Sequence, residues 1–165
     1  MQQTVLAGAS LLTAATAGAS VTPVKKEYTA ESTDPFHLYY GIHDGMFRKN
    51  AGDDFIDQIK FAYDHGFRAI EDNGLTHRPV AQQTKIGETL AKLGMHMGVF
   101  VLDKGGNGEN SLATGKPEYL EIFLKGCRQA VEVAKRVNAT WVTVVPGDFD
   151  RNIPIGIQTA NVIQA

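Results

Sequence analysis

A junction between a helix and a strand recurs three times in this chain of 165 residues. In each copy an amphipathic stretch ends at glycine or asparagine, and an apolar run follows at once. The copies are residues 63–70, 91–101 and 135–145. Gly and Asn adopt the left-handed conformation that ends many helices, and continuous apolar runs are typical of buried parallel strands. We therefore expect an α/β protein built from parallel βα repeats.

The repeat predicts four strands, at residues 36–42, 67–70, 95–102 and 139–145, from their apolar and aromatic content. Helices are predicted between them and after the last one, from the spacing of apolar residues. The expected helix starts are Asp53 or Asp54, Pro79, Pro117 and Pro154, and the expected ends are Gly66, Gly94 and Asn138. Two architectures fit this order: a small doubly wound sheet, or part of a (β/α)₈ barrel.

Composition narrows the classes of function. The chain has a formal net charge of -2 and is 43% hydrophobic, which is typical of a globular domain and argues against a general nucleic-acid binder. Its single cysteine, Cys127, excludes an intramolecular disulfide, and no Cys/His spacing suggests structural zinc. No G-x-G-x-x-G follows the first expected strand, so a dinucleotide site lacks its usual support.

The first segment differs from the rest of the chain. Residues 4–19 are small, apolar and uncharged, and they end in Ala17-Gly18-Ala19, a pattern that suits signal peptidase. Residues 1–20 are therefore expected to be a signal-like segment, although Gln2-Gln3 stands where a basic start is usual. An alanine-rich N-terminus is the alternative, and the stretch is too short for a stable membrane span. Residues 21–35 are expected to be a linker, and the protein to be exported to a bacterial periplasm, or otherwise cytoplasmic.

Four stretches carry a resemblance to a known family: residues 41–47, 57–74, 79–87 and 93–101, with Gly-Phe-x-x-Ile-Glu at 66–71 as their most specific element. They resemble hydroxypyruvate isomerase-like proteins of the xylose isomerase-like TIM-barrel superfamily, which are sugar phosphate isomerases and epimerases. The likeness implies that residues 36–165 form the N-terminal half of such a domain, with the first four units of a (β/α)₈ barrel.

The resemblance also implies a chemistry. Family members move a proton between adjacent carbons of a small hydroxy-carbonyl or sugar substrate, with a divalent metal (Mg, Mn or Zn) polarising the oxygens. In the family, the metal ligands and catalytic acids come mainly from the second half of the barrel, so no metal ligand or catalytic residue is assigned in this chain. The intact protein is thus expected to be an aldose-ketose type isomerase, and these 165 residues alone to be inactive.

Polar side chains that follow the expected strands are candidates for a substrate pocket, because barrel enzymes build their sites at the carboxyl ends of strands. The candidates are Glu71, His43, Asn73, Lys104 and Asp148. Each of these residues, apart from Asn73, also has a structural explanation that involves no ligand. Glu71 can hold loop amides, His43 and Lys104 can be ordinary loop residues, and Asp148 can cap the last helix.

Rival interpretations remain open at this level. The chain can be a non-catalytic, exported carbohydrate-binding protein on the same scaffold, or a complete small doubly wound domain. Expected partners are a small-molecule substrate and either a second copy of the chain or a missing C-terminal half, with no nucleic acid. Open sheet edges in a half-barrel predict that the isolated chain dimerises, aggregates or is marginally stable.

Overall fold

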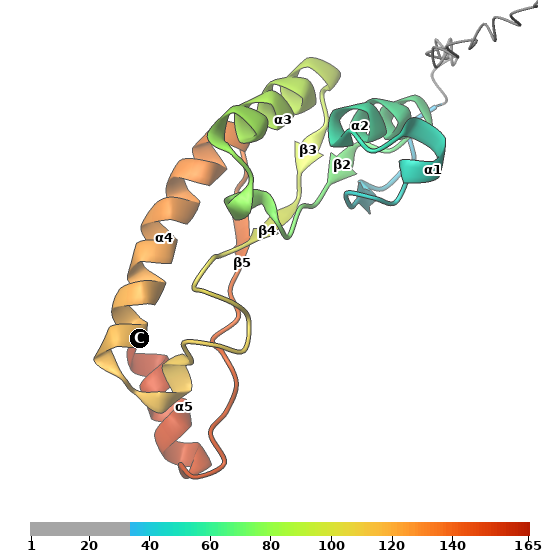
Figure 1. Cartoon of the computed structure of the whole chain (residues 1–165). Coiled ribbons are helices and arrows are strands. Elements are labelled where there is room, and N and C mark those ends of the chain that lie inside the picture. Colours follow the sequence, from blue (N-terminus) through green and yellow to red (C-terminus); the bar gives the residue numbers. More distant parts are fainter. Residues whose placement is uncertain (1–33) are drawn as a thin grey trace, which may run out of the picture.

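The structure is a computed structural model that describes residues 34–165 (Figure 1). It is an α/β fold in which every strand pairing is parallel. The signal-like segment 1–20 lies outside the described residues, as does nearly all of the expected linker 21–35. Within the described range, no helix is long and apolar enough to cross a membrane.

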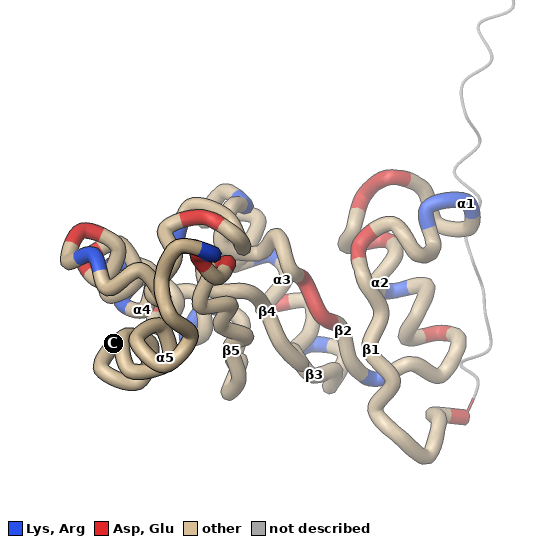
Figure 2. The backbone as a smooth tube through the Cα atoms, turned by 90° about the horizontal axis from the view of Figure 1, so that it is seen from below, with Lys and Arg blue, Asp and Glu red and all other residues tan. Residues whose placement is uncertain are grey.

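The strands lie beside one another in the order in which the chain makes them (Figure 2). One sheet has the order β1–β2–β3, and a second pairs β4 with β5. Only Gly98 separates β3 from β4, and its N–H donates to the carbonyl of Ile70 at 2.8 Å, so the two short strands continue one line of chain. The bounds are β1 Gly41–Ile42, β2 Ala69–Ile70, β3 His96–Met97, β4 Val99–Val101 and β5 Trp141–Thr143.

Helices alternate with these strands, and several of their ends follow the sequence prediction. The Asp54 carboxylate accepts the N–H of Ile56 at 2.8 Å, which confirms Asp54 as the cap of α2. Gly94 and Asn138 end α3 and α4 in the left-handed conformation, as predicted, and Pro117 opens α4. The bounds are α1 Arg48–Ala51, α2 Phe55–Asp64, η1 Leu75–His77, α3 Val80–Leu93, η2 Leu112–Thr114, α4 Pro117–Val137 and α5 Ile155–Gln164.

All four strands are shorter than predicted: the second occupies only Ala69–Ile70, and the third is divided at Gly98 into β3 and β4. The first strand was expected over 36–42 but occupies only Gly41–Ile42, because the Tyr40 N–H turns back to the Leu38 carbonyl at 2.9 Å and does not pair with β2. The Phe36 ring packs edge-on against Phe67 and Tyr40. The last strand was expected to be buried over 139–145, yet β5 covers only Trp141–Thr143 and all three residues are exposed. Among the described residues nothing pairs with the outer edge of β5, so its apolar composition does not lead to burial.

The core lies between the strands and the helices α2, α3 and α4, which follow one another in the same order as the strands (Figure 1). Ile42, Ile70 and Phe100 are fully buried strand residues in this core. The helices α3 and α4 approach so closely that a Cβ on Gly87 would lie 2.1 Å from the carbonyl oxygen of Arg136. At this contact only glycine fits. Fully buried helix residues of the core include Ile59 and Ile86.

Three helices carry a buried glutamine at the same place, their fourth residue. Gln58, Gln83 and Gln158 are each 3% exposed or less. Each side-chain amide bonds to backbone groups of the loop that precedes its helix, so it fixes that loop onto the helix. The partners are Gly45, Phe47 and Gly52 for Gln58, Leu75 and Arg78 for Gln83, and Asp150 and Ile153 for Gln158.

Candidate functional site

His43 and Glu71 meet at the carboxyl ends of β1 and β2. The strand register pairs Ile42 with Ile70, so the next residue of each strand faces its neighbour, and the Glu71 N–H donates to the Ile42 carbonyl at 3.0 Å. Nε2 of His43 contacts Oε1 of Glu71, with side chains 46% and 35% exposed. A histidine held by a carboxylate and open to solvent is an arrangement that enzymes use for general acid–base chemistry. The structure thus joins two candidates that the sequence proposed separately.

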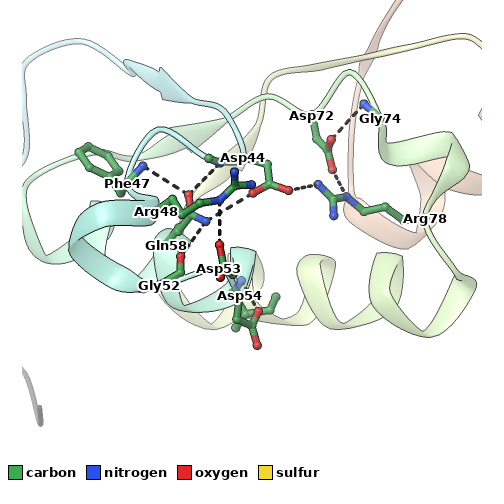
Figure 3. Close-up of polar contacts among 12 residues, drawn as sticks. Asp44, Phe47, Arg48, Gly52, Asp53, Asp54, Gln58, Asp72, Gly74 and Arg78 are labelled. Atoms are coloured by element: carbon green, nitrogen blue, oxygen red, sulfur yellow. Dashed lines mark hydrogen bonds and ion pairs between the residues drawn. The ribbon is translucent and has the colours of Figure 1, made fainter. Parts of the chain in front are cut away.

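A second bridge, in which Arg78 joins Asp44 and Asp72, ties the same two loops together (Figure 3). Nε of Arg78 donates to the Asp72 carboxylate at 2.5 Å, and its Nη2 donates to Asp44 at 2.8 Å. Asp72 is only 4% exposed, and the guanidinium supplies the opposite charge that a buried carboxylate needs. Burial alone would lower the pKa of Arg78, but the hydrogen bonds and charges of Asp72 and Asp44 outweigh it and raise that pKa above its ordinary value.

This bridge positions His43 and Glu71 because of where its members lie in the chain. Asp44 directly follows His43, and Asp72 directly follows Glu71. Each aspartate accepts a further hydrogen bond: Asp72 from the Gly74 N–H at 3.1 Å, and Asp44 from the Nε2 group of Gln58 at 3.4 Å. The backbone that carries His43 and Glu71 is therefore fixed on both strands.

Sequence reasoning missed Asp44 and Arg78, and it placed Asp72 at a strand end without choosing it as a candidate. A usable signal was present, since an acid follows each of two candidate residues at the ends of consecutive strands. The sequence does not show that the chain turns back after a short 3₁₀ helix. This turn places Arg78 between the two acids.

Asn73 belongs to a neighbouring cavity of about 280 Å³ at the carboxyl ends of β2 and β4. Thr76, His77 and Asp103 also line it, and Nδ1 of His77 lies 3.8 Å from the Asp103 carboxylate. The cavity offers amide, hydroxyl, imidazole and carboxylate groups, which suit a small hydroxylated ligand.

Lys104 is 3% exposed and bonds to its own loop. Its Nζ donates to the carbonyl of Gly106 at 2.9 Å, to that of Asn107 at 3.1 Å, and also to that of Glu109. Burial lowers the pKa of Lys104, although the carboxylates of Asp148 and Glu109 oppose the shift. The amine thereby closes the glycine-rich loop, and its contact with a substrate stays a prediction.

Asp148 lies in the loop after β5, with the glycine-rich loop rather than with His43. Its N–H donates to the Gly108 carbonyl at 3.0 Å, and its own carbonyl accepts the Ser111 hydroxyl at 2.5 Å. Pro154 holds the N-cap position of α5, so the alternative of Asp148 as the cap of that helix is not observed.

The residues of this region do not fit a metal centre. Within residues 34–165 no group of three or more His, Cys, Asp or Glu side chains is arranged to hold a metal ion. No step through a metal is therefore derived from these residues.

The fold and site define an α/β protein with parallel strands in chain order and polar side chains gathered where those strands end. No family model, no curated protein and no solved structure matches this chain.

Proposed function

We propose that this chain is part of an isomerase or epimerase that acts on small hydroxy-carbonyl or sugar substrates, of the hydroxypyruvate isomerase-like kind. In this proposal residues 36–165 supply the first four units of a (β/α)₈ barrel. The observation that carries it is the His43–Glu71 pair at the carboxyl ends of two adjacent parallel strands. Barrel enzymes place their reactive groups at those ends.

The strand order supports the barrel over a doubly wound sheet. In a barrel each parallel strand neighbours the next one in the chain, whereas a doubly wound sheet reverses direction after its first strands. Here β1, β2 and β3 are neighbours in chain order, and β4 continues β3 and pairs with β5. No reversal occurs among these strands.

The pair has the chemistry that such an isomerisation needs. The reaction removes a proton from a carbon beside a carbonyl group and returns one to the adjacent carbon. In the proposal Glu71 accepts the Nε2 proton of neutral His43, which leaves the Nδ1 lone pair free to take the substrate proton. The Arg78 bridge keeps the two groups in register during the transfer.

The test is a titration of the 165-residue chain with hydroxypyruvate, followed by nitrogen chemical shifts of its histidine rings. We expect the largest chemical-shift change at His43 and none at His65. The Nδ1 atom of His65 forms a hydrogen bond with the Phe61 carbonyl at 2.7 Å, at the C-terminal end of α2. Replacing Glu71 with Gln should weaken the response at least threefold. A folded chain whose His43 signals ignore hydroxypyruvate would refute the proposal.

A turnover assay completes the test. With hydroxypyruvate and Mg²⁺ or Mn²⁺, we expect no measurable isomerisation by these 165 residues, because the resemblance places the metal ligands and catalytic acids in the second half of a barrel. Rapid turnover would contradict the assignment of this chain as part of a larger catalytic unit.

A further inference from the structure

A second polar depression lies away from the His43–Glu71 pair and shares no residue with it. It is an open groove of about 680 Å³ between the loop 108–111 and the loop 148–152, with Tyr119 of α4 at its side. These loops follow β4 and β5, whereas His43 and Glu71 follow β1 and β2. The groove is therefore independent of the proposed proton-transfer site.

The walls of the groove are tied together. The Ser111 hydroxyl donates to the Asp148 carbonyl at 2.5 Å, and the Leu112 N–H donates to the Pro146 carbonyl at 2.9 Å. Between them Gly147 has a φ of +105°, and a Cβ there would lie 2.5 Å from the Cα of Ser111, so only glycine permits this approach. The shape of the groove is thus fixed before any ligand arrives.

Gln158 fixes the second wall. Its amide accepts the Asp150 N–H at 2.7 Å and donates to the carbonyls of Asp150 and Ile153 at 2.8 and 2.6 Å. The Asp150 carboxylate in turn accepts the backbone N–H of Asn152 at 2.8 Å and its side-chain amide at 3.1 Å. Binding to such a prepared wall costs little ordering of the loop.

The groups that face the groove are of two kinds. Phe149 is an aromatic residue left 64% exposed beside polar neighbours, and the ring of Tyr119 lines another part of the groove. Carboxylates come from Glu109, Asp148 and Asp150. Aromatic faces pack against the C–H faces of a sugar ring, while carboxylate and amide groups bind its hydroxyls.

Charge selects among sugars. Three carboxylates line the groove against one guanidinium, that of Arg151. The buried Lys104 ammonium interacts with Asp148 and Glu109 and offsets part of this charge, but the lining stays net negative. A net negative lining disfavours phosphorylated and acidic sugars relative to neutral ones. We infer that the groove binds a neutral saccharide, with Phe149 as the stacking surface and Asp148 and Glu109 as acceptors for hydroxyl groups.

The experiment is saturation-transfer NMR on the 165-residue chain with maltose, cellobiose, xylobiose and chitobiose as probes. We expect at least one of them to give a signal that Phe149→Ala weakens at least tenfold in affinity. Tyr39→Ala is the matched control, because Tyr39 is 70% exposed and its ring contacts His96, away from the groove. Phe149 is exposed, so its replacement leaves the fold intact, which amide spectra verify.

Several outcomes would overturn the inference. These are the absence of signal for all four saccharides, unchanged binding in both Phe149→Ala and Asp148→Asn, and equal binding of glucose and glucose 6-phosphate. Shifts at Glu109 and Asp148 with Ca²⁺ or Mg²⁺ alone, and none with a saccharide, would make the groove a cation site instead. His43→Gln should leave saccharide binding unchanged, so failure here and failure of the hydroxypyruvate titration are distinguishable.

Discussion

Arg78 and Asp72 form the most buried ion pair of the described residues, with side chains 16% and 4% exposed. Replacing Arg78 with Met leaves the Asp72 carboxylate buried without its partner and releases Asp44. We expect a loss of about 2–4 kcal/mol in the free energy of unfolding, measured by urea denaturation, because breaking a buried ion pair strands a charge.

Two variants check that this loss has the stated cause. Arg48→Met breaks an ion pair with Asp53 whose side chains are 60% and 89% exposed, so it should cost less than about 0.5 kcal/mol. The double variant Arg78→Met/Asp72→Asn should recover at least half of the stability lost by Arg78→Met alone. An Arg78 effect no larger than that of Arg48 would refute the argument.

Replacing a helical glycine with alanine should have opposite effects on stability at Gly87 and at Gly156. Alanine is favoured over glycine in helices by about 1 kcal/mol, and at Gly156 nothing lies within 4 Å of a new Cβ, so Gly156→Ala should raise stability. At Gly87 the Cβ meets the Arg136 carbonyl at 2.1 Å, and forcing α3 and α4 apart should cost about 1–3 kcal/mol net. Thermal melts of both variants measure the difference, and equal shifts would show that the two helices are not in close contact.

Lys104 makes stability depend on pH at the alkaline end. Its pKa in the folded chain is below the ordinary 10.5, so between the folded and the ordinary value the unfolded chain binds more protons. Stability should therefore rise with pH across that window. Lys104→Met removes this rise, so the stability difference between wild type and variant should grow from pH 7 to pH 10. Lys92→Met, at an exposed position, is the control, and the same pH trend in both variants would disprove the assignment to Lys104.

Trp141 predicts self-association of the 165-residue chain. It lies on the outer strand β5, and its side chain is 72% exposed, while Val142 beside it is 39% exposed. An exposed apolar edge strand pairs readily with another chain. Sedimentation velocity should show concentration-dependent association that Trp141→Lys suppresses, whereas Val131→Lys, at a residue 53% exposed on α4, should not. A wild-type chain that stays monomeric at high concentration would contradict this prediction.

The parallel α/β class and several helix ends could be predicted because they depend on local chemistry. Asp54, Gly94 and Asn138 act through their own backbone geometry and nearest neighbours, which the sequence contains in full. Burial of the last strand could not be predicted this way. The apolar residues of β5 were assigned to the interior, but burial depends on the elements around a strand, and in the described part of the chain no strand pairs with the outer edge of β5.

In the candidate site, too, the local features could be predicted and the three-dimensional contacts could not. His43 and Glu71 were proposed because each follows a strand, a property visible in the sequence. That they touch depends on the register of β1 against β2, and that Arg78 bridges the adjacent acids depends on a turn in three dimensions. Lys104 shows the converse. A lysine after a strand suggests a ligand contact, yet its three bonds are to carbonyls of its own loop.

The buried glutamines have a consequence for how this scaffold tolerates change. Gln158 holds its loop through main-chain N–H and C=O groups alone. Gln83 holds its loop through the carbonyls of Leu75 and Arg78, while its oxygen accepts from the Arg136 side chain of α4. Gln58 uses main-chain groups except for its longer contact with Asp44. A hydrogen bond to the main chain of a loop does not depend on which side chains that loop carries. The side chains of these loops can therefore change without loss of the hydrogen bonds that attach each loop to its helix.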